Sequence, residues 1–250
     1  MKIALFSQPR SRSSLLINSI SEYYKIKNYF EYFQSAGNSF LRRENIKNDP
    51  WLMYQDYASR AVTKMHNEPH CVKFIPTNFI DIFYKSEKSI TDTLLQDQSH
   101  HIKNFVDFFR LKDYDKIYIT YRENLTEALC SMNNANLNRS WWLREKKDLP
   151  FQAVDLTNTD IRNVMLKLIF TKVLLEKIEL KLTEHGISFI RLGYNEIPTY
   201  VQPQYPEVSP GVVETDLDYQ QLTPNFDEIQ TWVNDNYNAL NESMTQFRFS

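Results

Sequence analysis

The residues best suited to chemistry form a short hydroxyl-rich turn near the start of the chain. Residues 8–14 read QPRSRSS, and they follow the apolar run at residues 3–6 and precede Leu15 and Leu16. A buried strand that turns into a helix in this way is typical of a phosphate-binding loop, because backbone N–H groups at a helix start attract an anion. The cation of Arg10 and the Ser hydroxyls would complete the cradle. It is not the Walker loop of an ATPase, which requires glycines, because no Gly occurs before Gly37.

A carboxylate among aromatic side chains is the second group. Glu31 lies 21 positions after Arg10 and is flanked by Phe30, Tyr32 and Phe33. Aromatic neighbours exclude water, so we expect this carboxylate to be partly desolvated and able to take a proton from a hydroxyl group. Taken alone, the segment fits a Glu that faces water equally well.

An arginine and a serine near the middle of the chain are the third group. Arg122 directly follows the strand predicted for residues 116–121, and Ser131 lies nine residues further on, in the helix predicted next. Side chains at the carboxyl ends of parallel strands share one crevice. A guanidinium group there binds phosphate through two hydrogen bonds at once. The alternative is an exposed Arg122 paired with Glu123 or Glu127.

Together these three groups resemble the sulfotransferases that use 3′-phosphoadenosine-5′-phosphosulfate (PAPS), and most closely the bacterial sugar (trehalose-type) branch. The resemblance implies a P-loop NTPase-like sulfotransferase fold, PAPS as sulfuryl donor and no metal. It places Arg10 at the transferred group as a catalytic cation, with Glu31 as the general base. It assigns the 3′-phosphate to Arg122 and Ser131. Donor binding is then expected from Arg10, Ser11, Arg12, Ser13, Ser14, Leu15, Arg122 and Ser131.

One residue of the loop departs from the family pattern. Arg12 stands where the family usually has Gly. If the backbone there takes a positive φ, a side chain costs about 1 kcal/mol. Alternatively, Arg12 itself reaches an anion. The Arg-Lys-Gly segment with which cytosolic members complete the 3′-phosphate site has no counterpart in this sequence.

Several other residues compete for roles at such a site. Four histidines are alternative bases, and their clustering raises a weaker metal hypothesis that lacks a third ligand: His66, His70, His100 and His101. Two cations at predicted strand ends could face the donor or the rim, namely Lys73 and Arg191. Residues outside the predicted strands could bind a sugar or simply pack: Trp51, Tyr54, Trp141, Trp142 and Arg144.

Composition limits the classes of partner. The 250 residues include 29 basic and 31 acidic side chains, a net charge of −2, so any anion site must be local, and we expect no binding to nucleic acid. The two cysteines, Cys71 and Cys130, have no metal or redox spacing, which fits a reducing cytoplasm. The apolar runs are too short for a signal peptide or a membrane span.

Strand-like and helix-like segments alternate, which predicts an α/β fold with three layers, α/β/α, around a mainly parallel sheet. We expect a single domain over residues 1–250. The predicted strands cover residues 3–6, 71–75, 116–121 and 188–192. The predicted helices cover residues 13–24, 102–109, 125–132, 159–185 and 225–241, the last preceded by a proline-rich loop through Pro203, Pro206 and Pro210.

The sequence therefore favours a cytoplasmic enzyme that moves a sulfuryl group from PAPS to a hydroxyl of a small molecule or glycan, with a carbohydrate as the favoured acceptor. Two alternatives remain. A nucleotide-dependent kinase with a degenerate loop would need Mg²⁺ and a Lys at the loop end, where this chain has Ser14. A non-catalytic module would bind the nucleotide without turnover, and it would differ from the enzyme only in that Glu31 meets no bound acceptor. The acceptor and the oligomeric state stay open.

Overall fold

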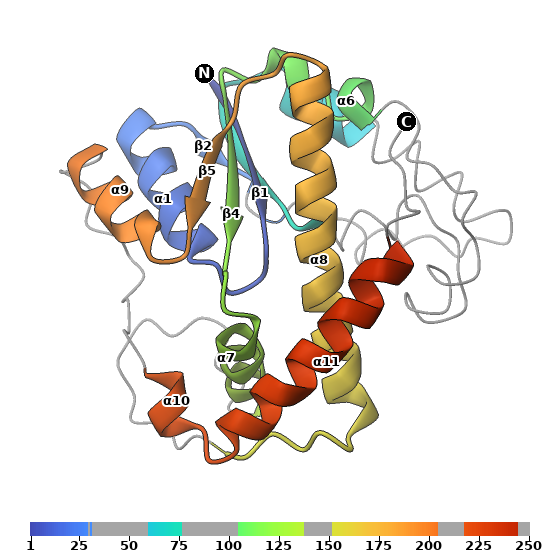
Figure 1. Ribbon diagram of the computed structural model, residues 1–250. Coiled ribbons are helices and arrows are strands. Elements are labelled where there is room, and N and C mark those ends of the chain that lie inside the picture. Colours follow the sequence, from blue (N-terminus) through green and yellow to red (C-terminus); the bar gives the residue numbers. More distant parts are fainter. Residues whose placement is uncertain (30, 32–59, 77–104, 138–151, 205–217, 245–250) are drawn as a thin grey trace, which may run out of the picture.

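Five parallel strands form the centre of the described structure, a computed structural model that covers residues 1–29, 31, 60–76, 105–137, 152–204 and 218–244 (Figure 1). Their order in the sheet is β2-β3-β1-β4-β5. The strands are β1 (Lys2–Ser7), β2 (Lys27–Asn28), β3 (His70–Phe74), β4 (Lys116–Tyr121) and β5 (Ile190–Gly193). The mainly parallel sheet predicted from the alternating pattern is therefore confirmed.

The central strands are apolar along their length because helices cover both faces of the sheet. In β1, Ile3 and Leu5 face one helical layer, while Ala4 and Phe6 face the other. Ala4 pairs with Val72 of β3 on one side and with Ile117 of β4 on the other. The short strand β2 was not predicted from the sequence because Lys27 and Asn28 are polar.

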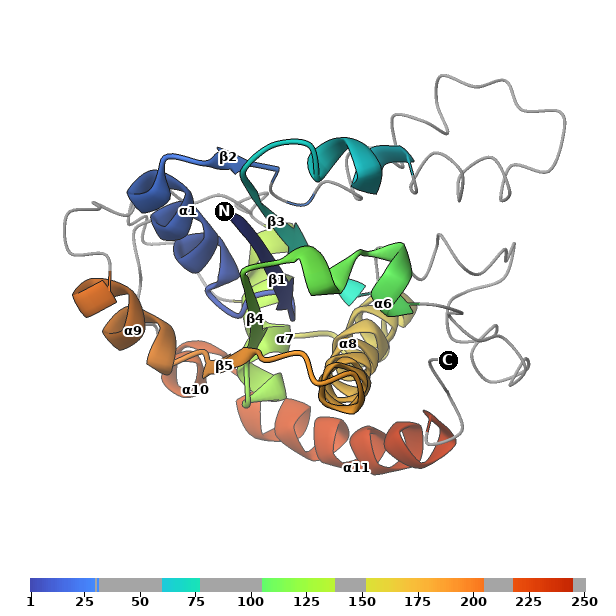
Figure 2. The same ribbon diagram turned by 90° about the horizontal axis from the view of Figure 1, so that it is seen from above.

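Helices on both faces complete three layers (Figure 2). The helices α1 (Ser13–Tyr24) and α9 (Glu196–Gln204) pack on one face. The helices α6 (Phe105–Phe108) and α8 (Thr159–Glu184) pack on the other, with the 3₁₀ turn η1 (Leu111–Asp113) beside them. The α/β/α architecture agrees with the sequence prediction.

A group of helices lies beyond the end of the sheet toward which the strands point (Figure 1). It consists of α7 (Leu125–Leu137), α10 (Tyr219–Leu222) and α11 (Phe226–Met244). They pack against the first half of α8 through a separate apolar cluster that includes Leu129, Met165 and Ile229. The second half of α8 belongs to the cluster on the sheet. One long helix therefore joins the sheet to the helices at its carboxyl end.

Most predicted elements are present, with shifted ends. Helix α1 covers the predicted residues, and α7 ends five residues after the predicted end at residue 132. Of the helix predicted at residues 102–109, the described part is helical over Phe105–Phe108. The loop predicted through Pro203 is wrong, because α9 includes that proline one residue before its end. A proline there removes only one helical hydrogen bond. Burial of Ile197 and Val201 against α1 stabilises the helix. Pro206 and Pro210 lie outside the described residues.

Both cysteines are buried as free thiols, Cys71 in β3 and Cys130 in α7. Burial raises the pKa of Cys71 to about 12. Within the described ranges, no helix combines the length and the apolar character that a membrane crossing requires.

A buried histidine pair lies at the amino end of the sheet. His70 begins β3 and pairs with Lys2 at the start of β1. The ring of His66 packs edge-on against His70 and Tyr114. Neither ring nitrogen of His66 has a hydrogen-bond partner in the described structure. Burial therefore lowers the pKa of His66 from 6.5 to about 4, with the charges of Arg110 and His70 acting in the same direction.

We expect the folded state to lose stability as the pH falls from about 6.5 to about 4. In that window His66 gains a proton in the unfolded chain but not in the folded one, so unfolding is favoured by about 1 to 3 kcal/mol. His66→Phe should flatten this part of the pH profile. Urea unfolding of both proteins across the window measures the difference, and identical profiles would contradict the role of His66.

Candidate anion-binding site

The loop between β1 and α1 lies at the carboxyl end of the sheet and is tied to the end of β4. Gln8 donates its backbone N–H to the Thr120 carbonyl at 3.1 Å. The Gln8 side-chain carbonyl accepts from the Arg122 backbone N–H at 3.0 Å. Ser11 donates its hydroxyl to the Gln8 carbonyl at 2.7 Å and lies 3.0 Å from the Thr120 hydroxyl. The Ser11 hydroxyl, predicted to contact the donor, thus shapes the loop.

Two arginines in this loop have a left-handed backbone. The φ angle is 62° at Arg10 and 57° at Arg12. Side chains rarely adopt this conformation, which glycine adopts without strain. The positive φ considered for Arg12 from the sequence is therefore confirmed. These two residues turn the chain from β1 into α1.

Within the described part of the chain, the amino-terminal end of α1 has backbone donors that no helical hydrogen bond uses. The first helical hydrogen bond runs from the Leu16 N–H to the Arg12 carbonyl at 3.3 Å. The N–H groups of residues 13–15 precede that bond, and the Arg12 side chain does not cap them. An anion at this end would accept from these N–H groups and would also be favoured by the helix dipole.

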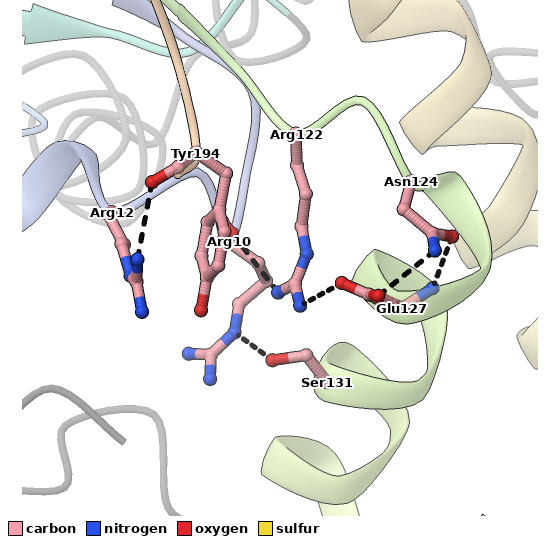
Figure 3. Close-up of polar contacts among 7 residues, drawn as sticks. All are labelled: Arg10, Arg12, Arg122, Asn124, Glu127, Ser131 and Tyr194. Carbon is pink, nitrogen blue, oxygen red and sulfur yellow. Dashed lines mark hydrogen bonds and ion pairs between the residues drawn. The ribbon is translucent and has the colours of Figure 1, made fainter. Parts of the chain in front are cut away.

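Arg10, Arg122 and Ser131 meet beside the loop, at the end of the sheet where the sequence analysis expected Arg122 and Ser131 (Figure 3). The Arg10 Nε donates to the Ser131 hydroxyl at 2.8 Å, although the two residues are 121 positions apart. The Arg122 guanidinium donates to the Arg10 carbonyl at 3.4 Å. Residues assigned to opposite ends of the donor therefore lie in direct contact.

Arg122 is buried, so the alternative of a surface arginine is wrong. Only 2% of the residue is exposed. The ion pair with Glu127 does exist, at 3.1 Å, and Asn124 holds that carboxylate through a 3.0 Å hydrogen bond. The Arg122 Nε is buried and has no partner in the described residues. A buried donor without a partner is costly, and a bound anion would relieve that cost.

The Arg10 guanidinium sits among positive charge and neutral groups. Burial lowers the pKa of Arg10, the charge of Arg122 acts in the same direction, and Tyr219 opposes both. Among the described ion pairs, none joins a carboxylate to Arg10. A partly buried cation without a carboxylate partner among the described residues favours the binding of an anion.

Lys73 of β3 links Glu31 to this loop, because its ammonium group contacts both Glu31 and Ser14. The Lys73 Nζ is 2.6 Å from a Glu31 carboxylate oxygen, and only 5% of the Lys73 side chain is exposed. The same ammonium donates to the Ser14 hydroxyl at 3.4 Å. Burial lowers the pKa of Lys73, whereas the charge of Glu31 opposes that shift. Of the two alternatives left open for Lys73, the structure therefore favours a position facing the loop.

The other candidates lie elsewhere. His66 and His70 are at the amino end of the sheet, far along the strands from the loop. The Arg191 side chain is 61% exposed and stacks on Tyr121 near Glu179. The remaining candidates lie outside the described residues: His100, His101, Trp51, Tyr54, Trp141, Trp142 and Arg144. The described part of the chain holds no group of three possible metal ligands.

Two tyrosines were missed by the sequence analysis. Tyr194 follows the carboxyl end of β5, and its ring contacts the guanidinium groups of Arg12 and Arg122. The central guanidinium carbon of Arg122 also lies 4.9 Å from the ring centroid of Tyr219 in α10. The position of Tyr194 directly after a strand was a usable signal, whereas nothing near Tyr219 in the sequence indicates a role.

Comparison with known proteins leaves the family unassigned. No protein-family model matches this chain, and a search of curated proteins found no similar sequence. The likeness to PAPS-dependent sulfotransferases therefore rests on the residues quoted above.

We expect Arg12→Gly to be more stable than Arg12→Ala by about 1 kcal/mol, because only Gly adopts the left-handed backbone without strain. Both substitutions remove the contact with Tyr194, so their difference isolates the backbone. Thermal unfolding should separate the two midpoints by about 3 °C. An equal or higher midpoint for the alanine variant would contradict strain at this position.

Proposed function

We propose that this protein transfers a sulfuryl group from PAPS to an acceptor hydroxyl, with a carbohydrate as the favoured acceptor. The observation that carries the proposal is the meeting of Arg10, Arg122 and Ser131 beside the start of α1, which the Arg12 side chain does not cap. Two sets of groups that can donate hydrogen bonds to an anion lie side by side there, one at the start of α1 and the other at Arg122 and Ser131. PAPS offers two separate anionic groups, the 5′-phosphosulfate and the 3′-phosphate.

The start of α1 suits the 5′-phosphosulfate. Backbone N–H groups of residues 13–15 and the Ser14 hydroxyl would hold the phosphate, as preorganised dipoles that need no rearrangement. Arg10 would counter the negative charge that grows on the leaving phosphate oxygen. Stabilising that charge and positioning the donor supply most of the rate in the related phosphoryl transfers.

Arg122 and Ser131 suit the 3′-phosphate. Arg122 is already oriented by Glu127 and by the loop carbonyl of Arg10. Ser131 offers a hydroxyl from α7, where it accepts from Arg10. A phosphate here would gain charge-assisted hydrogen bonds.

Glu31 is the proposed base. The acceptor oxygen attacks sulfur, the bond from sulfur to the phosphate oxygen breaks, and Glu31 takes the acceptor proton. The products are the sulfate ester and 3′,5′-bisphosphoadenosine. Lys73 fixes the carboxylate near Ser14, and hence near the donor. A positioned base of this kind contributes about 10²- to 10⁴-fold in rate.

Transfer of a phosphoryl group from ATP is the second candidate. One observation favours it: Lys73 lies 3.4 Å from Ser14 and so supplies, from β3, the lysine that the loop lacks. A non-catalytic nucleotide-binding module would use the same anion site without Glu31. Transfer from PAPS or from ATP separates the two transfer reactions. The effect of Glu31→Gln on turnover separates an enzyme from a non-catalytic module.

The direct test is a transfer assay with sulfur-labelled PAPS across sugars, lipids and phenols. We expect label on at least one sugar. Transfer from γ-labelled ATP, with none from PAPS, would replace the proposal by the second candidate.

We expect 3′,5′-bisphosphoadenosine to bind about 100-fold more tightly than AMP, because only the former carries a 3′-phosphate for Arg122 and Ser131. Ser131→Ala should reduce that preference about tenfold. Calorimetry measures both ratios, and Ser19→Ala, a buried serine of α1, is the matched control. Equal affinities for the two nucleotides would contradict the assignment.

Glu31→Gln should keep donor affinity and lower turnover about 10²-fold or more, because the amide still accepts from Lys73 but cannot take a proton. Glu68→Gln, which alters an exposed carboxylate paired with Lys27, serves as the control. Single-turnover transfer rates and donor titrations give the two quantities. Full turnover in Glu31→Gln would remove Glu31 from the chemistry.

A further inference from the structure

The Tyr194 ring lies between two arginines that come from distant parts of the chain (Figure 3). The central guanidinium carbon lies 3.9 Å from the ring centroid for Arg12 and 4.2 Å for Arg122. The Tyr194 backbone carbonyl also accepts from Arg12, at 3.4 Å. The turn after β5 is therefore joined to the loop after β1 and to the end of β4.

This arrangement works against electrostatic repulsion. Arg10, Arg12 and Arg122 gather in one small region, and the charge of Arg122 lowers the pKa of Arg10. Like charges at such separations repel, and more strongly when water is excluded. The negative faces of an aromatic ring attract a cation on each side. Tyr194 thus offsets part of the repulsion between Arg12 and Arg122.

The same contacts fix two flexible side chains. An unrestrained arginine loses considerable rotamer freedom when it binds a ligand. Stacking on Tyr194 orders Arg12 before any ligand arrives, while Glu127 orders Arg122 from the other side. Preorganised guanidinium groups bind an anion at lower entropic cost.

We propose that Tyr194 is a positioning residue that holds Arg12 and Arg122 toward one multiply charged anion, and that Arg12 contacts that anion. The proposal deepens the proposed function and rests on it for the identity of the ligand, since PAPS carries such a charge. It also gives a role to Arg12 at the place where the resembling family has Gly. Singly charged ligands should benefit little from this stack.

The test compares Tyr194→Phe, which keeps the ring, with Tyr194→Leu, which removes it. Calorimetry with 3′,5′-bisphosphoadenosine and with inorganic pyrophosphate should show about tenfold weaker binding for the leucine variant. The phenylalanine variant should bind within about twofold of the original protein. Tyr23→Leu, at an exposed tyrosine of α1, is the matched control.

Arg12→Ala gives an independent reading if the leucine variant does not fold. It should also bind pyrophosphate about tenfold more weakly, with a smaller dependence on salt. Combining Arg12→Ala with Tyr194→Leu should cost less than the sum of the two separate losses, because both changes break the contact between Arg12 and Tyr194, whereas only Tyr194→Leu also releases Arg122.

Several results would overturn the proposal. They are unchanged pyrophosphate binding in Arg12→Ala, equal losses in the phenylalanine and leucine variants, or fully additive losses in the double variant. Sulfuryl transfer is not among these readouts. A protein that fails to use PAPS but binds pyrophosphate through Arg12 and Tyr194 would refute the proposed function and retain this inference.

Discussion

The buried guanidinium of Arg122 is the contact on which the arrangement of the site depends. It joins the loop after β1 through the Arg10 carbonyl, α7 through Glu127, and the turn after β5 through Tyr194. Burying a cation costs free energy, which partners of opposite charge and hydrogen bonds offset. These contacts link three segments, far apart in sequence, at one end of the sheet.

Strain and uncompensated charge are concentrated at the same place. Arg10 and Arg12 have left-handed backbones, the first N–H groups of α1 are not capped by Arg12, and no described carboxylate pairs with Arg10. Each feature costs stability in the free protein, and a bound anion would offset the cost of the N–H groups and of the Arg10 charge. Their occurrence together supports the proposal of an anion site at this end of the sheet.

The fold could be predicted from the sequence where local patterns determine structure. The apolar run of β4 and the helical spacing in α8 are of this kind. Helix α9 was missed because a proline signal outweighed two apolar residues whose burial against α1 is a tertiary effect. Strand β2 was missed because its two residues, Lys27 and Asn28, are polar, and only their pairing with β3 makes them a strand.

The candidate site was predictable in part for the same reason. Arg10, Arg122 and Ser131 could be placed at the same edge of the sheet from the sequence alone, because the carboxyl ends of parallel strands lie at one edge. The pairing of Lys73 with Glu31 could not, since it depends on the order of strands in the sheet and on burial. The stack of Tyr194 between Arg12 and Arg122 likewise joins residues from three strand ends and has no counterpart in any local pattern.

A crystal structure of the complex with 3′,5′-bisphosphoadenosine tests the central claim most directly. The account predicts one phosphate within hydrogen-bond distance of the N–H groups of residues 13–15, and the other at Arg122 and Ser131. A nucleotide bound elsewhere, with this loop empty or Arg10 directed toward bulk water, would contradict it.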